Sequence, residues 1–129
     1  MSRRRFGDPL ARDPERRQAR VNDLLRRQLG MILEREFRDR LPAMATITEV
    51  RTTSDLRHAR VFISVYADKP LQEKTIRILQ EVTPEVRQVL AGEVLLRFLP
   101  TLEFIQDLSA EYAQHIEDLL HGHESGEKQ

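Results

Sequence analysis

Hydrophobic residues recur every three or four positions between residues 15 and 40, which is the spacing of a helix with one buried face. The stripe consists of Val21, Leu25, Leu29 and Ile32, with Leu24, Leu33 and Phe37 beside them. Gly30 lies within this segment and costs the helix about 1 kcal/mol relative to alanine. We expect the helix to end near Arg40, because Pro42 disfavours helical geometry at the residue before it.

The periodicity changes from helical to alternating over residues 45–52 and again over residues 60–66. Both segments are rich in β-branched residues, and such alternation is typical of strands with one buried face. Between them lie Ser54 and Asp55, whose side chains can satisfy the backbone of a turn. The pattern predicts an antiparallel β-hairpin with a loop longer than two residues.

Two helices follow the hairpin with almost no loop between them. The first begins at Pro70 and the second runs to about Arg97. They meet at the helix junction, Val82-Thr83-Pro84, because Pro84 disfavours helical geometry at the residue before it. Threonine is a good N-cap and proline is favoured at the first helical position, so we expect Thr83 to cap the second helix.

A third strand and a last helix complete the pattern. The strand is predicted at residues 102–105. The helix follows it, and we expect Asp107 or Ser109 to cap the N-terminus of this helix. Its apolar stripe contains Tyr112, Ala113, Ile116, Leu119 and Leu120. Gly122 is expected to end the helix, because glycine is common just after a helix C-terminus.

The predicted order is helix, strand, strand, helix, kink, helix, strand, helix. Three strands with helices grouped on one face predict an α+β sandwich. The pair of abutting helices between the second and third strands is also the central unit of KH domains, where the junction clamps a nucleic-acid backbone.

The chain of 129 residues is expected to form one domain. Residues 1–14 show no periodicity and are predicted to be a flexible basic arm, and residues 122–129 a disordered polar tail. The domain would therefore span residues 15–121. The sequence contains no cysteine, which excludes disulfides and thiolate zinc sites, and no apolar stretch approaches the roughly 18 residues of a membrane helix.

Net charge is zero over the whole chain, but the charges are unevenly distributed. Residues 1–60 contain 15 Lys plus Arg and 9 Asp plus Glu, a net charge of +6, whereas residues 61–129 contain 6 and 12, a net charge of −6. Most of the basic residues are arginine, the side chain best shaped for contacts with phosphates and bases. A basic first half favours a nucleic-acid partner, although balanced charges also serve solubility alone.

Arginines of the first predicted helix are the leading candidates for an RNA-binding surface. They are Arg16, Arg17, Arg20, Arg26 and Arg27. Arg16, Arg20 and Arg27 share one helical face, nearly opposite the apolar stripe, where they would neutralise phosphates and release counterions. The alternative is an ordinary solvated face, because Asp23 and Glu34 lie on the same stripe and would temper its potential.

Further candidates lie elsewhere in the chain. Those near the hairpin are Arg51, Arg57 and Arg60, and those near the helix junction are Arg77 and Arg87. Phe62 and Tyr66 alternate on one strand and would suit base stacking, but we expect at least Phe62 to help fill the core. Asp55 is expected to be a turn residue. The sequence contains no convergent acid–base pair, phosphate loop or rigid metal-ligand set, so no enzymatic activity, cofactor or small-molecule substrate is expected.

Four segments of the sequence resemble the ribosome-binding factor A family in order and spacing over roughly residues 16–120. They begin with Arg17-Gln18-Ala19-Arg20-Val21, Thr46-Ile47-Thr48-Glu49-Val50, Ala59-Arg60-Val61-Phe62-Ile63 and Arg97-Phe98-Leu99-Pro100-Thr101. The last segment is fairly specific to the family, and the four segments together make the resemblance strong. The sequence departs from the family at the helix junction, which usually reads Ala-x-Gly and here is Val82-Thr83-Pro84.

The resemblance implies a type II KH-like fold and a non-enzymatic cytoplasmic factor. Such a factor binds the immature small ribosomal subunit with its 16S rRNA and assists a late step of rRNA processing and maturation. We expect the free protein to be a monomer without a membrane partner. The alternative is a protein-interaction module that recruits a basic partner through its acidic second half.

Overall fold

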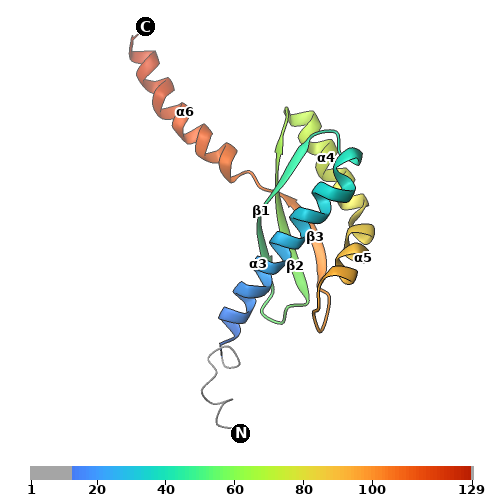
Figure 1. Ribbon diagram of the computed structural model, residues 1–129. Helices are drawn as coiled ribbons and strands as arrows, with labels where there is room; N and C mark the ends of the chain where they lie inside the picture. The colour runs from blue at the N-terminus through green and yellow to red at the C-terminus, as the bar shows by residue number, and fades with distance from the viewer. Residues whose placement is uncertain (1–12, 129) are drawn as a thin grey trace.

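The computed structural model describes residues 13–128, and its elements follow the predicted order (Figure 1). The first half contains α3 (Pro14–Ile32), a π-helical turn η1 (Leu33–Phe37), a 3-10 turn η2 (Arg38–Arg40), β1 (Met44–Thr52) and β2 (His58–Tyr66). The second half contains α4 (Lys69–Glu81), α5 (Thr83–Glu93), β3 (Thr101–Gln106) and α6 (Ser109–Lys128). Of the predicted basic arm, residues 1–14, the first twelve residues lie outside the described part of the chain.

Helix α3 begins with favourable capping chemistry. The Asp13 side chain accepts a hydrogen bond from the backbone N–H of Arg16 at 3.0 Å, and Pro14 occupies the first helical position. The apolar stripe packs against β1 with Leu25, Leu29 and Ile32 fully buried. Burial of each such side chain contributes about 1.5–3 kcal/mol. The helix is extended by η1 and η2 to Arg40, so its predicted end is confirmed.

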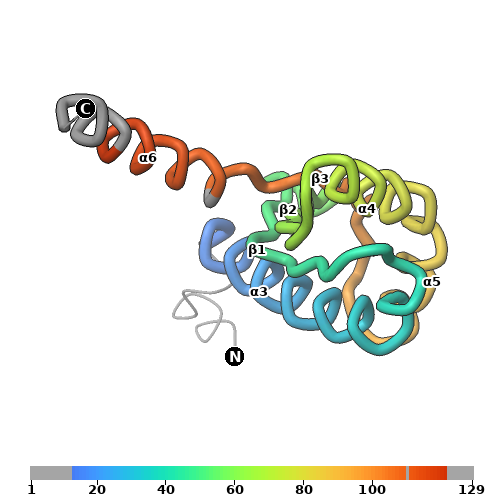
Figure 2. Tube along the Cα trace, turned by 90° about the horizontal axis from the view of Figure 1, so that it is seen from above, coloured from blue at the N-terminus to red at the C-terminus, as the bar shows by residue number. Residues whose placement is uncertain are grey.

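The three strands form one sheet in the order β1-β2-β3. The predicted antiparallel hairpin of β1 and β2 is confirmed, and β3 pairs with β2 in parallel. Along β2 the residues Ala59, Val61, Ile63 and Val65 are buried, and the residues between them face the other side. Helices α3, α4 and α5 cover the buried face, and the opposite face stays open (Figures 1 and 2). The predicted α+β sandwich is confirmed.

A β-bulge interrupts the alternation of β1. The register with β2 shifts between Ile47 and Glu49, which leaves Thr48 as the extra residue. Ile47 and Val50 are therefore both buried although they are three residues apart. The Thr48 hydroxyl donates to the carboxylate of Asp107 at 2.5 Å, which fixes the end of β3. Hydrogen bonds from Ser109 and Thr48 hold the pKa of Asp107 below its usual range.

The helix junction differs from the predicted capping. Val82, not Thr83, is the N-cap residue of α5, and no side chain caps this helix. The Thr83 hydroxyl instead donates back to the carbonyl oxygen of Leu79 in α4 at 2.9 Å. The expectation that Thr83 caps α5 is therefore wrong, because its hydroxyl is engaged by the preceding helix. The buried side chain of Val82 anchors the bend in the core.

Helix α5 ends four residues earlier than the sequence predicts. Its last residue is Glu93, and Val94 takes extended geometry with φ −122° and ψ 146°. Two local features favour the earlier end. Gly92 weakens the last turn, and the extended backbone buries the side chain of Val94 in the core. Residues 94–100 therefore form a loop and not the end of a helix.

Helix α6 extends away from the sheet (Figure 2). It continues past Gly122 to Lys128, so the predicted end of the helix at Gly122 is wrong. The cost of about 1 kcal/mol for an internal glycine is too small to end a helix by itself. The apolar stripe of α6 is exposed instead of packed, with Tyr112, Ile116, Leu119 and Leu120 all open to solvent.

A buried polar network joins α3 to the end of β1. The side-chain oxygen of Asn22 accepts the backbone N–H of Thr52 at 3.0 Å and the Thr52 hydroxyl at 2.6 Å. Gln18 donates to the carbonyl oxygen of Thr52. Thr52 is buried, so these partners replace the water that its polar groups lose on folding.

Replacing Asn22 with alanine should lower the free energy of unfolding by about 1–3 kcal/mol, because two buried donors of Thr52 would lose their acceptor. Urea unfolding measures this change. N22D retains an acceptor oxygen and should lose less, and R26A serves as a control on the exposed side of the same helix. A loss for N22A no larger than that of R26A would contradict a stabilising role for the network.

Candidate nucleic-acid interface

The side of α3 that faces solvent carries five arginines, which we call the α3 arginine face. They are Arg16, Arg17, Arg20, Arg26 and Arg27, and all are exposed. Their position follows from the helical period, because the opposite side of the helix is fixed in the core by Leu25, Leu29 and Ile32.

Only part of this face is neutralised by neighbouring carboxylates. Arg27 lies 3.4 Å from the carboxylate of Asp23, and Arg16 lies 4.0 Å from that of Asp13. In the part of the chain that the structure describes, no ion pair engages Arg17, Arg20 or Arg26. Exposed pairs contribute little energy, so Arg16 and Arg27 remain able to exchange their carboxylate for a phosphate.

Three hollows follow one another along α3. The largest, about 580 Å³, lies between α3 and β1 and is lined by Arg26 and Arg27. The second, about 410 Å³, is lined by Arg17, Arg20 and Arg27. The third, about 360 Å³, is lined by Arg17 together with the loop after α5. Arg27 and Arg17 each line two hollows, so the arginine face borders a continuous uneven surface.

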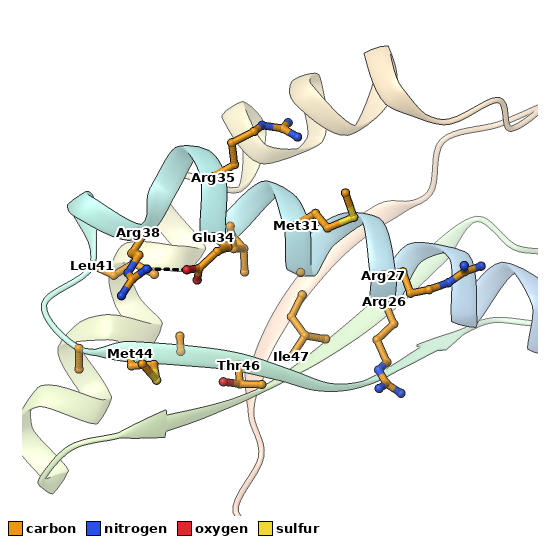
Figure 3. Close-up of a pocket in the computed structure, with 14 residues that line it drawn as sticks. Arg26, Arg27, Met31, Glu34, Arg35, Arg38, Leu41, Met44, Thr46 and Ile47 are labelled. Atoms are coloured by element: carbon orange, nitrogen blue, oxygen red, sulfur yellow. Dashed lines mark hydrogen bonds and ion pairs between the residues drawn. The ribbon is translucent and has the colours of Figure 1, made fainter.

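The largest hollow, which we call the α3–β1 groove, has an apolar middle and charged ends (Figure 3). Met31, Met44 and Ile47 lie along it, with Arg26 at one end. At the other end Arg38 pairs with Glu34 at 2.6 Å. Met31 and Met44 are exposed, so the apolar middle is open to a partner.

Arg35 and Arg38 also line the groove, although neither is among the arginines predicted from the sequence. Their spacing of three was a usable signal, but the neighbouring Glu34 and Glu36 obscured it. Arg35 hydrogen-bonds to Glu36 and to Glu93 of α5, and these carboxylates raise the pKa of its guanidinium. Arg35 therefore connects η1 to α5 and contributes little free positive charge to the groove.

Two predicted arginines, Arg51 and Arg60, lie on the open face of the sheet. Arg51 hydrogen-bonds to Glu49 at 2.5 Å, which raises the pKa of Arg51, and Arg60 lies 4.0 Å from Glu103. The guanidinium of Arg51 also stands 5.3 Å from the ring centre of Phe62. Phe62 is half-buried on this open face, so the expectation that it fills the core is wrong. The one-residue alternation of β2 gives the core positions to Val61 and Ile63.

The three remaining predicted arginines have different surroundings. Arg57 is exposed in the turn between β1 and β2, and Arg77 is exposed on α4. Arg87 is half-buried and donates to the carbonyl oxygens of Pro100 at 3.0 Å and Leu99 at 2.8 Å. The contacts of Arg87 are structural, so the interface proposed below leaves it out.

The helix junction offers few free backbone donors. The N–H of Val82 already donates to Ile78, Pro84 has no N–H, and the N–H of Val86 donates back to Val82. Beside the junction, Glu85 forms two hydrogen bonds with Arg40, which lower the pKa of Glu85. This pair joins η2 to α5 and places a carboxylate next to the junction, where a phosphate would be repelled.

In the described residues, the acidic and histidine side chains form no group of three or more that could hold a metal ion. Asp55 accepts hydrogen bonds from the Thr53 hydroxyl and the backbone N–H of Arg57, which lower the pKa of Asp55 and give it the predicted turn role. None of the described helices has the length and apolar character of a membrane span.

A family model described as ribosome-binding factor A matches residues 17–120. The chain belongs to the ribosome-binding factor A family. Curated members include one from Thermomicrobium roseum, 36% identical over 107 residues, which are 83% of each chain. Another, from Chlorobium phaeobacteroides, is 41% identical over 106 residues, which cover 81% of this chain and 90% of the relative.

Solved structures of ribosome-binding factor A share the fold. The crystal structure of the Thermus thermophilus protein matches with a TM-score of 0.60 and 26% identity, over 69% of this chain and 94% of that one. A homology model of the Thermus thermophilus protein, fitted into the cryo-EM map of a 30S complex, matches with a TM-score of 0.56 and 25% identity, over 67% of this chain and 91% of that one. The KH-like fold implied by the resemblance is therefore confirmed.

Within this family fold, Gly30 lies near the end of α3, where the helix continues without a break into η1, and it lines the α3–β1 groove. A Cβ atom at this position would meet nothing within 4 Å, and its φ is not positive. G30A should therefore raise the free energy of unfolding by about 0.5–1 kcal/mol, because alanine loses less backbone entropy in a helix. Urea unfolding measures the gain.

G92A is the matched comparison, because a Cβ atom there also meets nothing but the residue lies in the last turn of α5. Its gain should be smaller, since helix ends fray. Destabilisation by G30A would mean that the groove needs the close approach of the glycine backbone.

Proposed function

We propose that this member of the ribosome-binding factor A family is a non-enzymatic assembly factor of the small ribosomal subunit. It binds the rRNA of the immature subunit and assists a late step of rRNA processing and maturation in the cytoplasm. The observation that carries the proposal is the α3 arginine face, whose Arg17, Arg20 and Arg26 have no ion-pair partner among the described residues.

The chemistry of this face suits the phosphate backbone of RNA. Arginine remains charged at any physiological pH and presents five donors that match phosphate oxygens. Each phosphate contact releases counterions, so binding should weaken steeply with salt. The side chains stand on a helix whose other side is packed in the core, so their spacing is fixed before RNA arrives.

The action that we propose is mechanical. A compact domain bound to rRNA phosphates holds one local RNA conformation and excludes others. This action requires that the free energy of binding differ between the immature and the mature subunit. The homology model fitted into a 30S complex is of a related protein with the same fold, and it supports the small subunit as the partner here.

Charge reversal at Arg20 should weaken binding of the full chain to immature small subunits and lower the slope of log K against log salt by about 1. Co-sedimentation with small subunits over a salt series measures both quantities. K74E is the matched control, because it makes the same charge change at an exposed residue of α4. Equal loss for R20E and K74E would mean that only net charge matters, and the α3 arginine face would then not be the interface.

The alternative function is recruitment of a basic protein partner by the acidic second half. The exposed apolar stripe of α6 favours this alternative, because exposed apolar patches mark protein interaction sites. The stripe lies on the same helix as acidic residues such as Glu111 and Asp118, which suit a basic partner. Ribonuclease treatment separates the two functions. Loss of small-subunit association after treatment supports RNA as the contact, whereas a retained single protein partner supports the alternative.

A further inference from the structure

The loop between α5 and β3 presents large apolar side chains to solvent. Leu95 is fully exposed, and Phe98 is 58% exposed. Single exposed apolar residues are common in soluble proteins, but these two line the same hollow of about 360 Å³, which we call the Phe98 hollow. Its size falls in the range of small-ligand sites, about 300–1,000 Å³.

Two arginines from separate segments approach the ring of Phe98. The guanidinium carbon of Arg57, in the turn between β1 and β2, lies 5.4 Å from the ring centre, and that of Arg97 lies 5.8 Å away. No ion pair engages either arginine in the described part of the chain. Both guanidinium groups therefore lie over the ring of Phe98, and a base that stacks on this ring takes the place of one of them.

The loop that carries Phe98 is firmly held at its base. Arg87 donates to the carbonyl oxygens of Leu99 and Pro100, and Pro100 is fully buried. The N–H of Thr101 donates to the carbonyl oxygen of Arg57 at 2.9 Å, which joins the loop to the β1–β2 turn. The ring and both guanidinium groups therefore stand on segments that are already connected, so little order would have to be gained on binding.

One of the residues that line the hollow has a strained backbone conformation. Leu56 has φ 60°, the left-handed region, and is the only residue other than glycine with positive φ in the described part of the chain. This geometry costs a non-glycine residue about 1–2 kcal/mol. The side chain of Leu56 lines the hollow together with Val21 and Leu95. Such strain is often retained where a side chain must hold one position in a binding site.

We propose that the Phe98 hollow binds one unpaired nucleotide of single-stranded RNA, with its base stacked on Phe98 and its phosphates near Arg57, Arg97 and Arg17. The proposal rests on the proposed function and adds to it a contact with unpaired RNA, at a place other than the helix junction. Every base has a face that stacks on an aromatic ring, whereas duplex bases are already stacked and out of reach.

The positive charge of the site favours RNA over a protein segment as its occupant. Asp55 is the single carboxylate among the lining residues, and its oxygen already accepts hydrogen bonds from Thr53 and the N–H of Arg57. Arg17 belongs both to this hollow and to the α3 arginine face. A strand anchored at Phe98 would therefore continue along α3 without a break in positive charge.

The test is binding of the full chain to a short single-stranded RNA that carries 2-aminopurine at one central position, and to the same RNA annealed to its complement. Wild-type protein should change the 2-aminopurine fluorescence of the single strand, because stacking on an aromatic ring alters its emission. F98A should weaken single-strand binding by about 5- to 100-fold, the effect of losing one stacked base, and leave duplex binding unchanged. F98W should retain both.

Y112A is the matched control, because Tyr112 is 67% exposed on α6 and this variant removes an equally open aromatic ring from another place. F98L tests the alternative that any apolar side chain suffices, and urea unfolding checks that each variant keeps the wild-type stability. Wild-type affinity of F98A for the single strand overturns the proposal. So does equal loss with F98A and Y112A, full retention with F98L, or a defect of F98A confined to intact subunits, which would indicate a ribosomal protein as the occupant.

Co-sedimentation with small subunits distinguishes this proposal from the proposed function. A wild-type protein that ignores small subunits but stacks the labelled base would contradict the assembly role and keep the nucleotide site. A protein that binds small subunits through Arg20, yet shows no effect of F98A on single-stranded RNA, would keep the assembly role and remove the nucleotide site.

Discussion

Packing of α3 against β1 is the constraint on which the other features depend. Leu25, Leu29 and Ile32 bury one side of the helix. At one end the Asn22 amide fixes the helix to the buried Thr52, so the helix can neither rotate nor slide without breaking paired polar groups. Because one side is fixed in this way, the arginines on the other side must face solvent. The position of the candidate interface is therefore a consequence of the core.

Ion pairs then decide how much of that positive charge is available. Arg35 and Arg40 reach Glu93 and Glu85 of α5, and so connect the end of the long helix to the helix junction region. The first two turns of α3 keep their charge, since acids within reach are few there. The available positive charge is therefore concentrated on the N-terminal part of α3 and at the neighbouring Phe98 hollow, and is not spread over the whole first half of the chain.

The open face of the sheet and helix α6 are the parts where local pattern and final structure differ most. The amphipathic stripe of α6 predicts a helix correctly, but a stripe indicates only that a partner would be favourable and not that the domain supplies one. Here three helices already cover one face of a three-stranded sheet, and α6 follows β3 and extends away from the sheet (Figure 2). Phe62 shares this open face, because its neighbours Val61 and Ile63 occupy the core.

The sequence by itself determined the order of elements, the one-sided sheet, the bend between α4 and α5, and the arginine face opposite the apolar stripe of α3. All of these follow from periodicity and from proline, which act within a few residues of the chain. Tertiary structure alone decided that Arg87 holds the carbonyl of Pro100, that Arg35 pairs with Glu93, and that Arg57 meets Phe98. Contacts between distant residues depend on how the elements pack in three dimensions, and spacing along the chain carries no record of that geometry.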